Sequence, residues 1–240
     1  MTSRKAVDYY VRRKPELLTD FDRVALQWGA VLSSCDDEGS ADEVLPEARA
    51  EFEALLPLIP YIGGEQNHLT ESLIGSVQCL AFYRAMAARG KTAGEAGKIL
   101  YDAVRAHPTQ YIPRISPSQR LSRDELMERR RERAKWSQER RYAWDWVYEF
   151  VEGDGESFDY GYDFTECATA RFYRSEGAEE FLPFYCFLDF PKCELAGLGL
   201  SRTTTLAEGG QKCDFRFSEG AKSTQDWPPP FLRDGRTPVN

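Results

Sequence analysis

Residues 158–167 read FDYGYDFTEC, and at this stretch the pattern of the chain changes. Aromatic side chains occupy every second position from Phe158 to Phe164, with aspartate or glycine between them. This period of two is typical of a half-buried β-strand, because successive side chains of a strand point to opposite faces of the sheet. The stretch therefore predicts a sheet in the last third of the chain.

Downstream of this strand, short helices and two further strands are expected. Helices are predicted over 167–175 and 178–189, the second ended by Pro191. Strands are predicted at 200–206 and 212–217, separated by a Gly-Gly turn.

Upstream, the sequence up to about residue 150 predicts helices. Apolar residues recur at helical spacing over 7–32 and 69–88. Capping boxes are indicated at Thr92–Glu95 and at the start of 122–150, which is read as one helix. The prolines of 108–117 favour an extended connector.

Together these elements predict an α+β fold. We expect an N-terminal helical half packed on a C-terminal half that contains a small, mostly antiparallel sheet with flanking helices. The predicted regions are a helical one at 1–150, an α/β one at 151–217 that carries the candidate site, and an extended, proline-containing tail at 218–240.

The net charge of -8 argues against nucleic acid as a partner, because phosphate binding requires concentrated positive charge. One local exception is 120–141, with nine basic and five acidic residues. It is either an anion or nucleic-acid patch or the solvated face of a helix. Glutamates interleaved at helical pairing distances favour the solvated face.

No apolar run reaches the roughly 20 residues that span a bilayer, and the first 13 residues lack a signal-peptide core. Six scattered cysteines do not form a disulfide scaffold, so we expect reduced thiols in a cytoplasmic protein. They lie at positions 35, 79, 167, 186, 193 and 213. The expected partner is a small-molecule substrate, without membrane or nucleic acid; the sequence does not determine the oligomeric state.

Cysteines and carboxylates crowd into the last third of the chain. Glu166 precedes Cys167 at the end of the predicted strand, and Cys186 lies three residues before Asp189, which would place both on one helix face. Cys213 and the following Asp214 should point to opposite faces of their strand.

Three interpretations of this cluster stay open on the residues alone. One thiol is a nucleophile assisted by Asp189 or Glu166. Alternatively, three residues of the set Cys167, Cys186, Cys213 and Glu166 ligate zinc, although no paired ligand spacing is present. Alternatively, the cysteines are small apolar core residues.

Candidate substrate-binding residues lie in two places. Asn67 and His68 follow a Gly-Gly pair and precede a helix, where backbone N–H groups can meet an anion; the alternative is a tight turn in which Asn67 caps the helix. Arg202 and Arg216 can each fork onto a carboxylate, and Arg216 can equally pair with Asp214 on its own strand face.

At these residues the chain resembles the L-2-amino-thiazoline-4-carboxylic acid hydrolase family. The similarity covers roughly 9–217, including PLIPYIGGEQNHLTESLIG from Pro57 and the more specific block from Glu166-Cys167 through Cys186 and Asp189 to CDFRF at Cys213. The tail beyond it does not match.

The resemblance implies a hydrolase that adds water at C2 of a thiazoline ring and opens it towards N-carbamoyl-L-cysteine, a step towards L-cysteine. It also implies the catalytic set Cys186 and Asp189, with Glu166 or Cys213 close by, and Arg216 for the substrate carboxylate. No metal and no cofactor are expected. The alternatives are a non-catalytic small-molecule or zinc-binding sensor, which a more distant similarity to vinyl-reductase-type domains favours, and a biosynthetic tailoring enzyme acting on a larger substrate.

Overall fold

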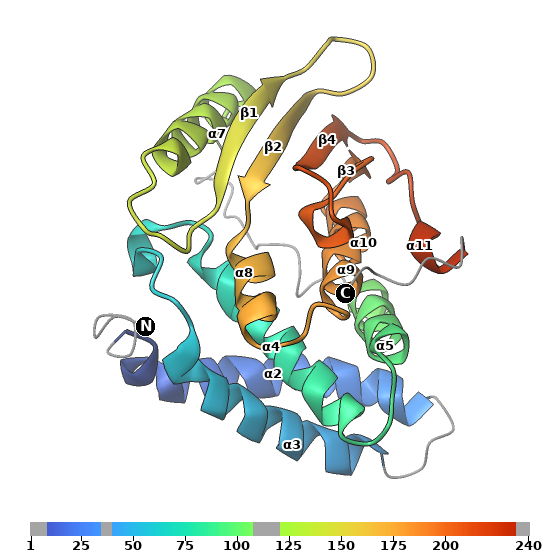
Figure 1. The fold of residues 1–240 in the computed structure, drawn as a ribbon. Helices are drawn as coiled ribbons and strands as arrows, with labels where there is room; N and C mark the ends of the chain where they lie inside the picture. The colour runs from blue at the N-terminus through green and yellow to red at the C-terminus, as the bar shows by residue number, and fades with distance from the viewer. Residues whose placement is uncertain (1–8, 35–39, 108–120, 234–240) are drawn as a thin grey trace. The chain divides into compact units, whose positions relative to one another are not determined.

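The computed structural model describes residues 9–34, 40–107 and 121–233 (Figure 1). The connector predicted at 108–117 and Cys35 lie outside these residues. The chain divides into two compact units that interleave in sequence. The first unit runs to Ala106 and includes Thr169–Leu188, whereas the second comprises His107–Ala168 and the chain from Asp189 onward.

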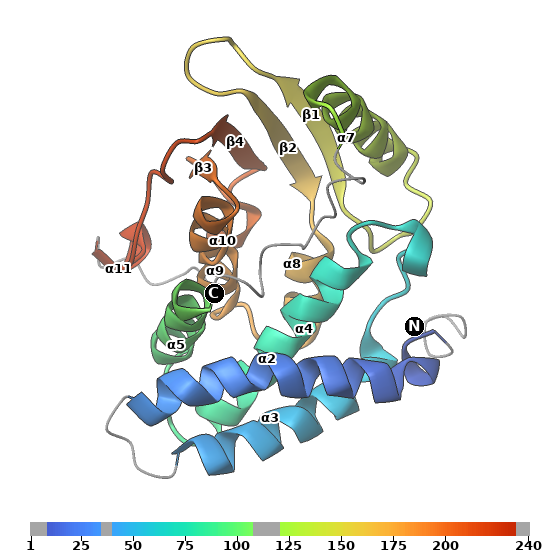
Figure 2. The same ribbon diagram turned by 180° about the vertical axis from the view of Figure 1, so that it is seen from behind.

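The first unit is helical. Helices α2 and α3 lie side by side, α4 packs on α3, and α5 contacts α2, α4 and α9 (Figures 1 and 2). Aromatic rings fill the core, with Trp28 against Phe82 at 4.9 Å and Tyr83 stacked on Phe181 at 4.5 Å between ring centroids. The helices are α2 (Lys14–Ser34), α3 (Ser40–Leu55), α4 (Thr70–Ala87), α5 (Ala93–Ala106), α8 (Ala168–Ser175) and α9 (Leu182–Phe187), with 3-10 turns η1 (Leu56–Leu58) and η2 (Gly64–Gln66).

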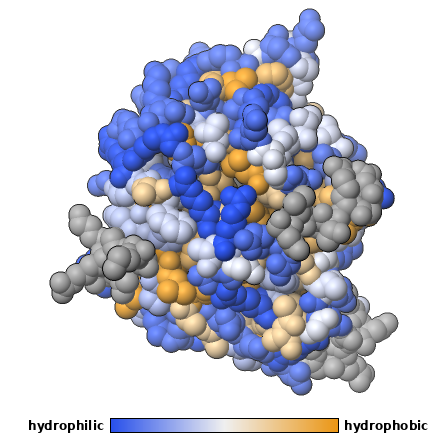
Figure 3. All heavy atoms as spheres, viewed as in Figure 1, coloured by the Kyte–Doolittle hydropathy of each residue, from blue (hydrophilic) through white to orange (hydrophobic). Residues whose placement is uncertain are grey.

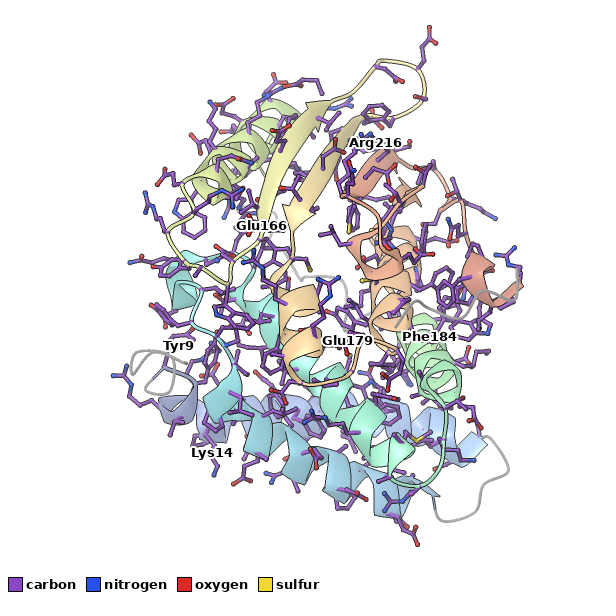
Figure 4. The ribbon with its side chains drawn as sticks, in the orientation of Figure 1. Tyr9, Lys14, Glu166, Glu179, Phe184 and Arg216 are labelled. Atoms are coloured by element: carbon purple, nitrogen blue, oxygen red, sulfur yellow. The ribbon has the colours of Figure 1, made fainter. Side chains whose placement is uncertain are left out.

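Gly97 permits a close approach of α5 to α9. A β-carbon at this position would lie 2.8 Å from the β-carbon of Phe184, closer than side chains tolerate. Phe184, labelled in Figure 4, thus packs directly on the α5 backbone. The start of α5 is as predicted: the side chains of Thr92 and Glu95 form a capping box.

The second unit is built on a four-stranded antiparallel sheet in the order β1-β2-β4-β3. Helix α7 packs on β1 and helix α10 on β3. The elements are α7 (Arg123–Gln138), β1 (Val147–Glu152), β2 (Tyr160–Glu166), α10 (Asp189–Leu195), β3 (Leu198–Ser201), η4 (Leu206–Glu208), β4 (Cys213–Glu219) and α11 (Pro230–Arg233). The sheet and the helices confirm the predicted α+β class.

The single helix predicted over 122–150 is wrong in its second half. The capping box of Ser122 and Glu125 opens α7 as predicted, but the helix ends at Gln138 and Arg140 adopts a positive φ of 48°. Val147–Glu152 is strand β1, paired with β2. The backbone of this segment pairs with β2 in an antiparallel ladder. This tertiary pairing overrides a local sequence pattern that also fits a helix.

Two further boundaries differ from the prediction. Pro191 does not end a helix; it lies in the first turn of α10, where its missing N–H has no helical partner to lose. Strand β3 ends at Ser201 rather than near residue 206. The backbone N–H groups of Thr203 and Thr204 donate to the Asp214 carboxylate instead of to a strand, at 2.9 and 2.8 Å.

The segment after β4 makes more contacts than the extended tail expected from its prolines. Thr224 N–H donates to the Leu200 carbonyl at 2.9 Å, and Phe231 of α11 is buried. The chain therefore continues to contribute to the second unit up to Arg233. In the described part of the chain, no helix is long and apolar enough to cross a membrane.

Candidate active site

One face of the second unit's sheet is almost wholly aromatic. The register pairs Tyr148 with Phe164 and Tyr160 with Phe217, and paired residues share a face. The full set is Tyr148, Phe150, Tyr160, Tyr162, Phe164, Phe215 and Phe217, called here the aromatic face. Four of these seven rings stay half-exposed: Phe150, Tyr162, Phe164 and Phe215. Such a surface can bind a planar ring.

An ion pair lies at the β4 side of the aromatic face. Arg202 donates from Nη1 to Oδ2 of Asp189 at 2.9 Å, and its guanidinium stacks on the rings of Phe215 and Phe190, 4.9 and 5.2 Å from the centroids. The Arg202 side chain is only 4% exposed, whereas Asp189 is 35% exposed. The structure thus brings together two of the predicted site residues, as a buried cation that holds an accessible carboxylate.

Cys213 lies on the aromatic face, opposite to Asp214 as its strand position predicts. The side chain is buried, and Leu206 N–H donates to its sulfur at 3.2 Å. Burial raises the pKa of the Cys213 thiol to about 12, although this hydrogen bond opposes the shift. Burial also raises the pKa of Cys193 on α10 to about 12. Both sulfurs are therefore neutral thiols near pH 7.

These raised pKa values predict slow alkylation of Cys193 and Cys213 by iodoacetamide in the native protein at pH 7.5. Labelling should rise by about tenfold per pH unit, because only the thiolate reacts. Since the ordinary thiol pKa is 9.0, the free energy of unfolding should fall as the pH rises from 9 towards 12. Peptide mapping by mass spectrometry measures the labelling; rapid modification of Cys213 at pH 7.5 would contradict this assignment.

Arg216 lies on the opposite, polar face of the sheet. Its Nη1 donates to Oδ1 of Asp163 at 2.9 Å, and Lys212 pairs with the other oxygen of the same carboxylate. The side chain packs over Gly161, where a β-carbon would lie 2.9 Å from it. Arg216 therefore pairs with Asp163, whereas Asp214 accepts hydrogen bonds from the loop after β3.

Glu166 lies at the end of β2 and pairs with Arg140. Because Gly161 is the partner of Arg216, Glu166 lies five residues further along the strand, roughly 17 Å away. Figure 4 shows the two labelled side chains well separated along the sheet. Arg216 therefore does not converge with Glu166, whereas Cys213 pairs with Phe164, two residues before Glu166 on the same strand.

The remaining predicted residues belong to the first unit. Cys186 is in α9 and Asp189 begins α10, with Leu188 between the two helices, so they do not lie on one helix as predicted. Asn67 is buried: its amide donates to the Ile62 carbonyl at 2.7 Å and accepts from Leu69 N–H at 2.9 Å. Asn67 thus lies in a turn, but the N-cap residue of α4 is Leu69 rather than Asn67. His68 follows it in the same loop.

Within the ranges 9–34, 40–107 and 121–233, no group of three histidine, cysteine, aspartate or glutamate side chains lies close enough together to hold a metal ion. A zinc site built from Cys167, Cys186, Cys213 and Glu166 therefore has no support from ligand geometry.

A family model described as L-2-amino-thiazoline-4-carboxylic acid hydrolase matches residues 71–217, more than half of the chain. The chain belongs to this family. The range that matches the L-2-amino-thiazoline-4-carboxylic acid hydrolases includes β1 to β4 up to Phe217, Asp189 and Arg202, but not the loop of Asn67 and His68. No curated protein and no solved structure gave a significant match.

Sequence reasoning missed two features of this site. Asp189 and Arg202 were both selected, but their pairing across 13 residues has no local signal. The contribution of β1 to the aromatic face was missed because Tyr148 and Phe150 were assigned to a helix. The alternation of Val147–Glu152 could have indicated a strand.

Proposed function

We propose that this family member is a hydrolase that opens the thiazoline ring of L-2-amino-thiazoline-4-carboxylic acid, and that its site is the aromatic face with Asp189. Family membership over 71–217 supports the reaction class. The accessible carboxylate held beside a half-exposed aromatic surface supports the location.

The reaction makes three physical demands. Carbon C2 is bonded to two nitrogens and a sulfur, so it is an amidine-like centre. Water adds to C2, the C2–S bond breaks, and the departing sulfur takes up a proton, which gives N-carbamoyl-L-cysteine. A carboxylate to hold the protonated amidine, an attacking oxygen and a cation for the substrate carboxylate would meet these demands.

The observation that carries the proposal is the geometry of Asp189. Arg202 binds Oδ2, and in the described part of the molecule Oδ1 accepts no hydrogen bond. Oδ1 is thus available to accept an N–H of the amidinium. Arg202 acts as a positioning residue, because its nearly complete burial between two phenylalanine rings fixes the carboxylate that it holds.

Water, rather than Cys213, is the proposed nucleophile. A thiol with a pKa of about 12 is ionised in roughly one molecule in 10⁵ at pH 7, so it is a poor attacking group. We expect Cys213→Ala to release thiol from the substrate within about threefold of the wild-type rate. The rate can be followed with a disulfide reagent that reports free thiol and by mass spectrometry of the product.

Three outcomes would change the proposal. Loss of turnover in folded Cys213→Ala would return this thiol to the mechanism. Loss in folded Cys186→Ser, with Cys213→Ala active, would make Cys186 the nucleophile. If the wild type binds the thiazoline without releasing thiol, the small-molecule sensor or an enzyme with a larger substrate replaces the hydrolase.

A further inference from the structure

One side of helix α7 is fixed against the sheet. Ala134 and Ser137 are buried there, and the Ser137 hydroxyl donates to the Tyr148 carbonyl at 3.0 Å while Tyr148 N–H donates to Ser137 Oγ at 3.1 Å. Arg130 and Arg133 each lie four residues before one of these positions, so they share the sheet-facing side of the helix. The outer side of α7 faces solvent, and in Figure 3 the surface at the upper left, over α7, is predominantly hydrophilic.

Both inward arginines lie over the aromatic face. The Arg130 guanidinium lies 3.7 Å from the centre of the Tyr160 ring. Burial raises the pKa of Tyr162, and the nearby charges of Arg130 and Arg133 oppose that shift, which locates both cations close to this phenol. Cys193 of α10, one helical turn after Asp189, also lies near Tyr160.

Arg130 and Arg133 have no carboxylate partner among the described residues; in this they resemble the exposed Arg129 and differ from Arg123 and Arg131. Arg123 pairs with Asp159 and Arg131 with Glu152, both at 2.6 Å. Neither Arg130 nor Arg133 pairs with an acid in the described residues, and Nη1 of Arg130 is buried without a hydrogen-bond partner. Burial lowers the pKa of Arg133, and the charge of Arg129 lowers it further.

Such an arrangement is unfavourable for the empty protein. A buried donor without an acceptor costs free energy, and two neighbouring cations repel each other. An anion between them would satisfy the unpaired donor and neutralise the repulsion. Because a guanidinium presents a planar fork of donors, a carboxylate is the anion that it matches best.

We propose that Arg130 and Arg133 form the binding site for the carboxylate of a small ring acid, whose ring lies on the half-exposed part of the aromatic face. The assignment of that acid as the thiazoline substrate rests on the proposed function. The substrate carboxylate then meets α7 while its amidinium is directed towards Asp189 on the α10 side. In this proposal, the sheet-facing side of helix α7 is an anion site and the outer side of the helix is a solvated surface.

The test is binding of a stable analogue to the whole protein. Isothermal titration calorimetry compares 2-aminothiazole-4-carboxylate with its neutral 4-carboxamide. We expect the wild type to prefer the carboxylate by at least about tenfold, the range of charge-assisted hydrogen bonds. Arg130→Gln and Arg133→Gln should each reduce this preference, and the double variant should bind the two probes within about twofold.

Arg129→Gln is the matched control, because it removes the same charge from the exposed side of the same helix; it should keep the preference. Thermal unfolding without ligand adds a second readout. Since the inward arginines have no carboxylate to lose, Arg133→Gln should unfold at the wild-type temperature or above it.

The outcomes separate this inference from the proposed function. A carboxylate preference that survives in the double variant, or a wild type that shows no preference or binds neither probe, overturns the anion site. An arginine-dependent preference without thiol release from the thiazoline supports the anion site and removes only the named reaction. Unchanged KM for turnover in the double variant would overturn the anion site and leave the hydrolase.

Discussion

Asp189→Asn is expected to reduce thiol release from L-2-amino-thiazoline-4-carboxylic acid by at least about 100-fold, the usual effect of removing a group that stabilises charge in the transition state. The asparagine side chain keeps the size of aspartate but not its charge, so the amidinium loses its counter-charge. The same change leaves the Arg202 cation, which is 4% exposed, without its carboxylate.

The stability effect of this variant should be smaller than for a fully buried pair. Breaking a buried ion pair costs about 3–5 kcal/mol, and because Asp189 is 35% exposed, we expect about 2 kcal/mol. Urea denaturation measures this loss. Adding Arg202→Met should restore much of the stability, since no buried charge remains unpaired, but it should not restore turnover.

Asp163→Asn is the matched control for Asp189→Asn. Asp163 also accepts from an arginine at 2.9 Å, but it lies on the polar face of the same sheet. Asp163→Asn should lose only a little stability, because surface and half-buried ion pairs contribute modestly to it. It should keep turnover within about threefold, because Asp163 lies on the face of the sheet away from the proposed site. If Asp163→Asn loses turnover and Asp189→Asn does not, the substrate binds on the Arg216 side of the sheet.

The second large effect is expected in the first unit. Trp28→Ala should lower the free energy of unfolding by about 4 kcal/mol, because truncation of a large aromatic residue leaves a cavity. Trp28 is 1% exposed and packs against Phe21 and Phe82. Far-UV circular dichroism suits the measurement, since this unit is helical.

Leu26→Ala provides the control on the same helix, because Leu26 is 71% exposed. It should change the free energy of unfolding by less than about 0.5 kcal/mol. The other four tryptophans lie in the second unit, so fluorescence of Trp28→Ala reports on that unit alone. A loss below about 1 kcal/mol in Trp28→Ala would show that this aromatic cluster is not a close-packed core.

Signals contained within a few residues could be predicted from the sequence. The boxes at Thr92–Glu95 and Ser122–Glu125 form as expected, because the capping side chains reach only one helical turn. The alternation from Tyr160 to Phe164 likewise predicted β2. Residues 147–152 could not be assigned with the same ease, since their pairing with β2 decides between two local patterns.

The candidate site was harder to predict than the elements. The sequence indicated Asp189, Arg202 and Cys213 as candidate site residues. The structure adds that Asp189 pairs with Arg202 and that Cys213 is a buried, neutral thiol. Neither property has a sequence pattern, because both depend on burial by distant elements. Arg130 and Arg133 were expected on a solvated helix face; only the docking of α7 on β1 distinguishes them from Arg129.

Hydrolysis of the thiazoline ring by this chain is tested most directly by incubating the purified wild type with L-2-amino-thiazoline-4-carboxylic acid. Free thiol should appear in equal amount to N-carbamoyl-L-cysteine identified by mass spectrometry, at a rate that Asp189→Asn lowers by at least about 100-fold and Asp163→Asn retains. Thiol release no faster than in the protein-free control would contradict the claim.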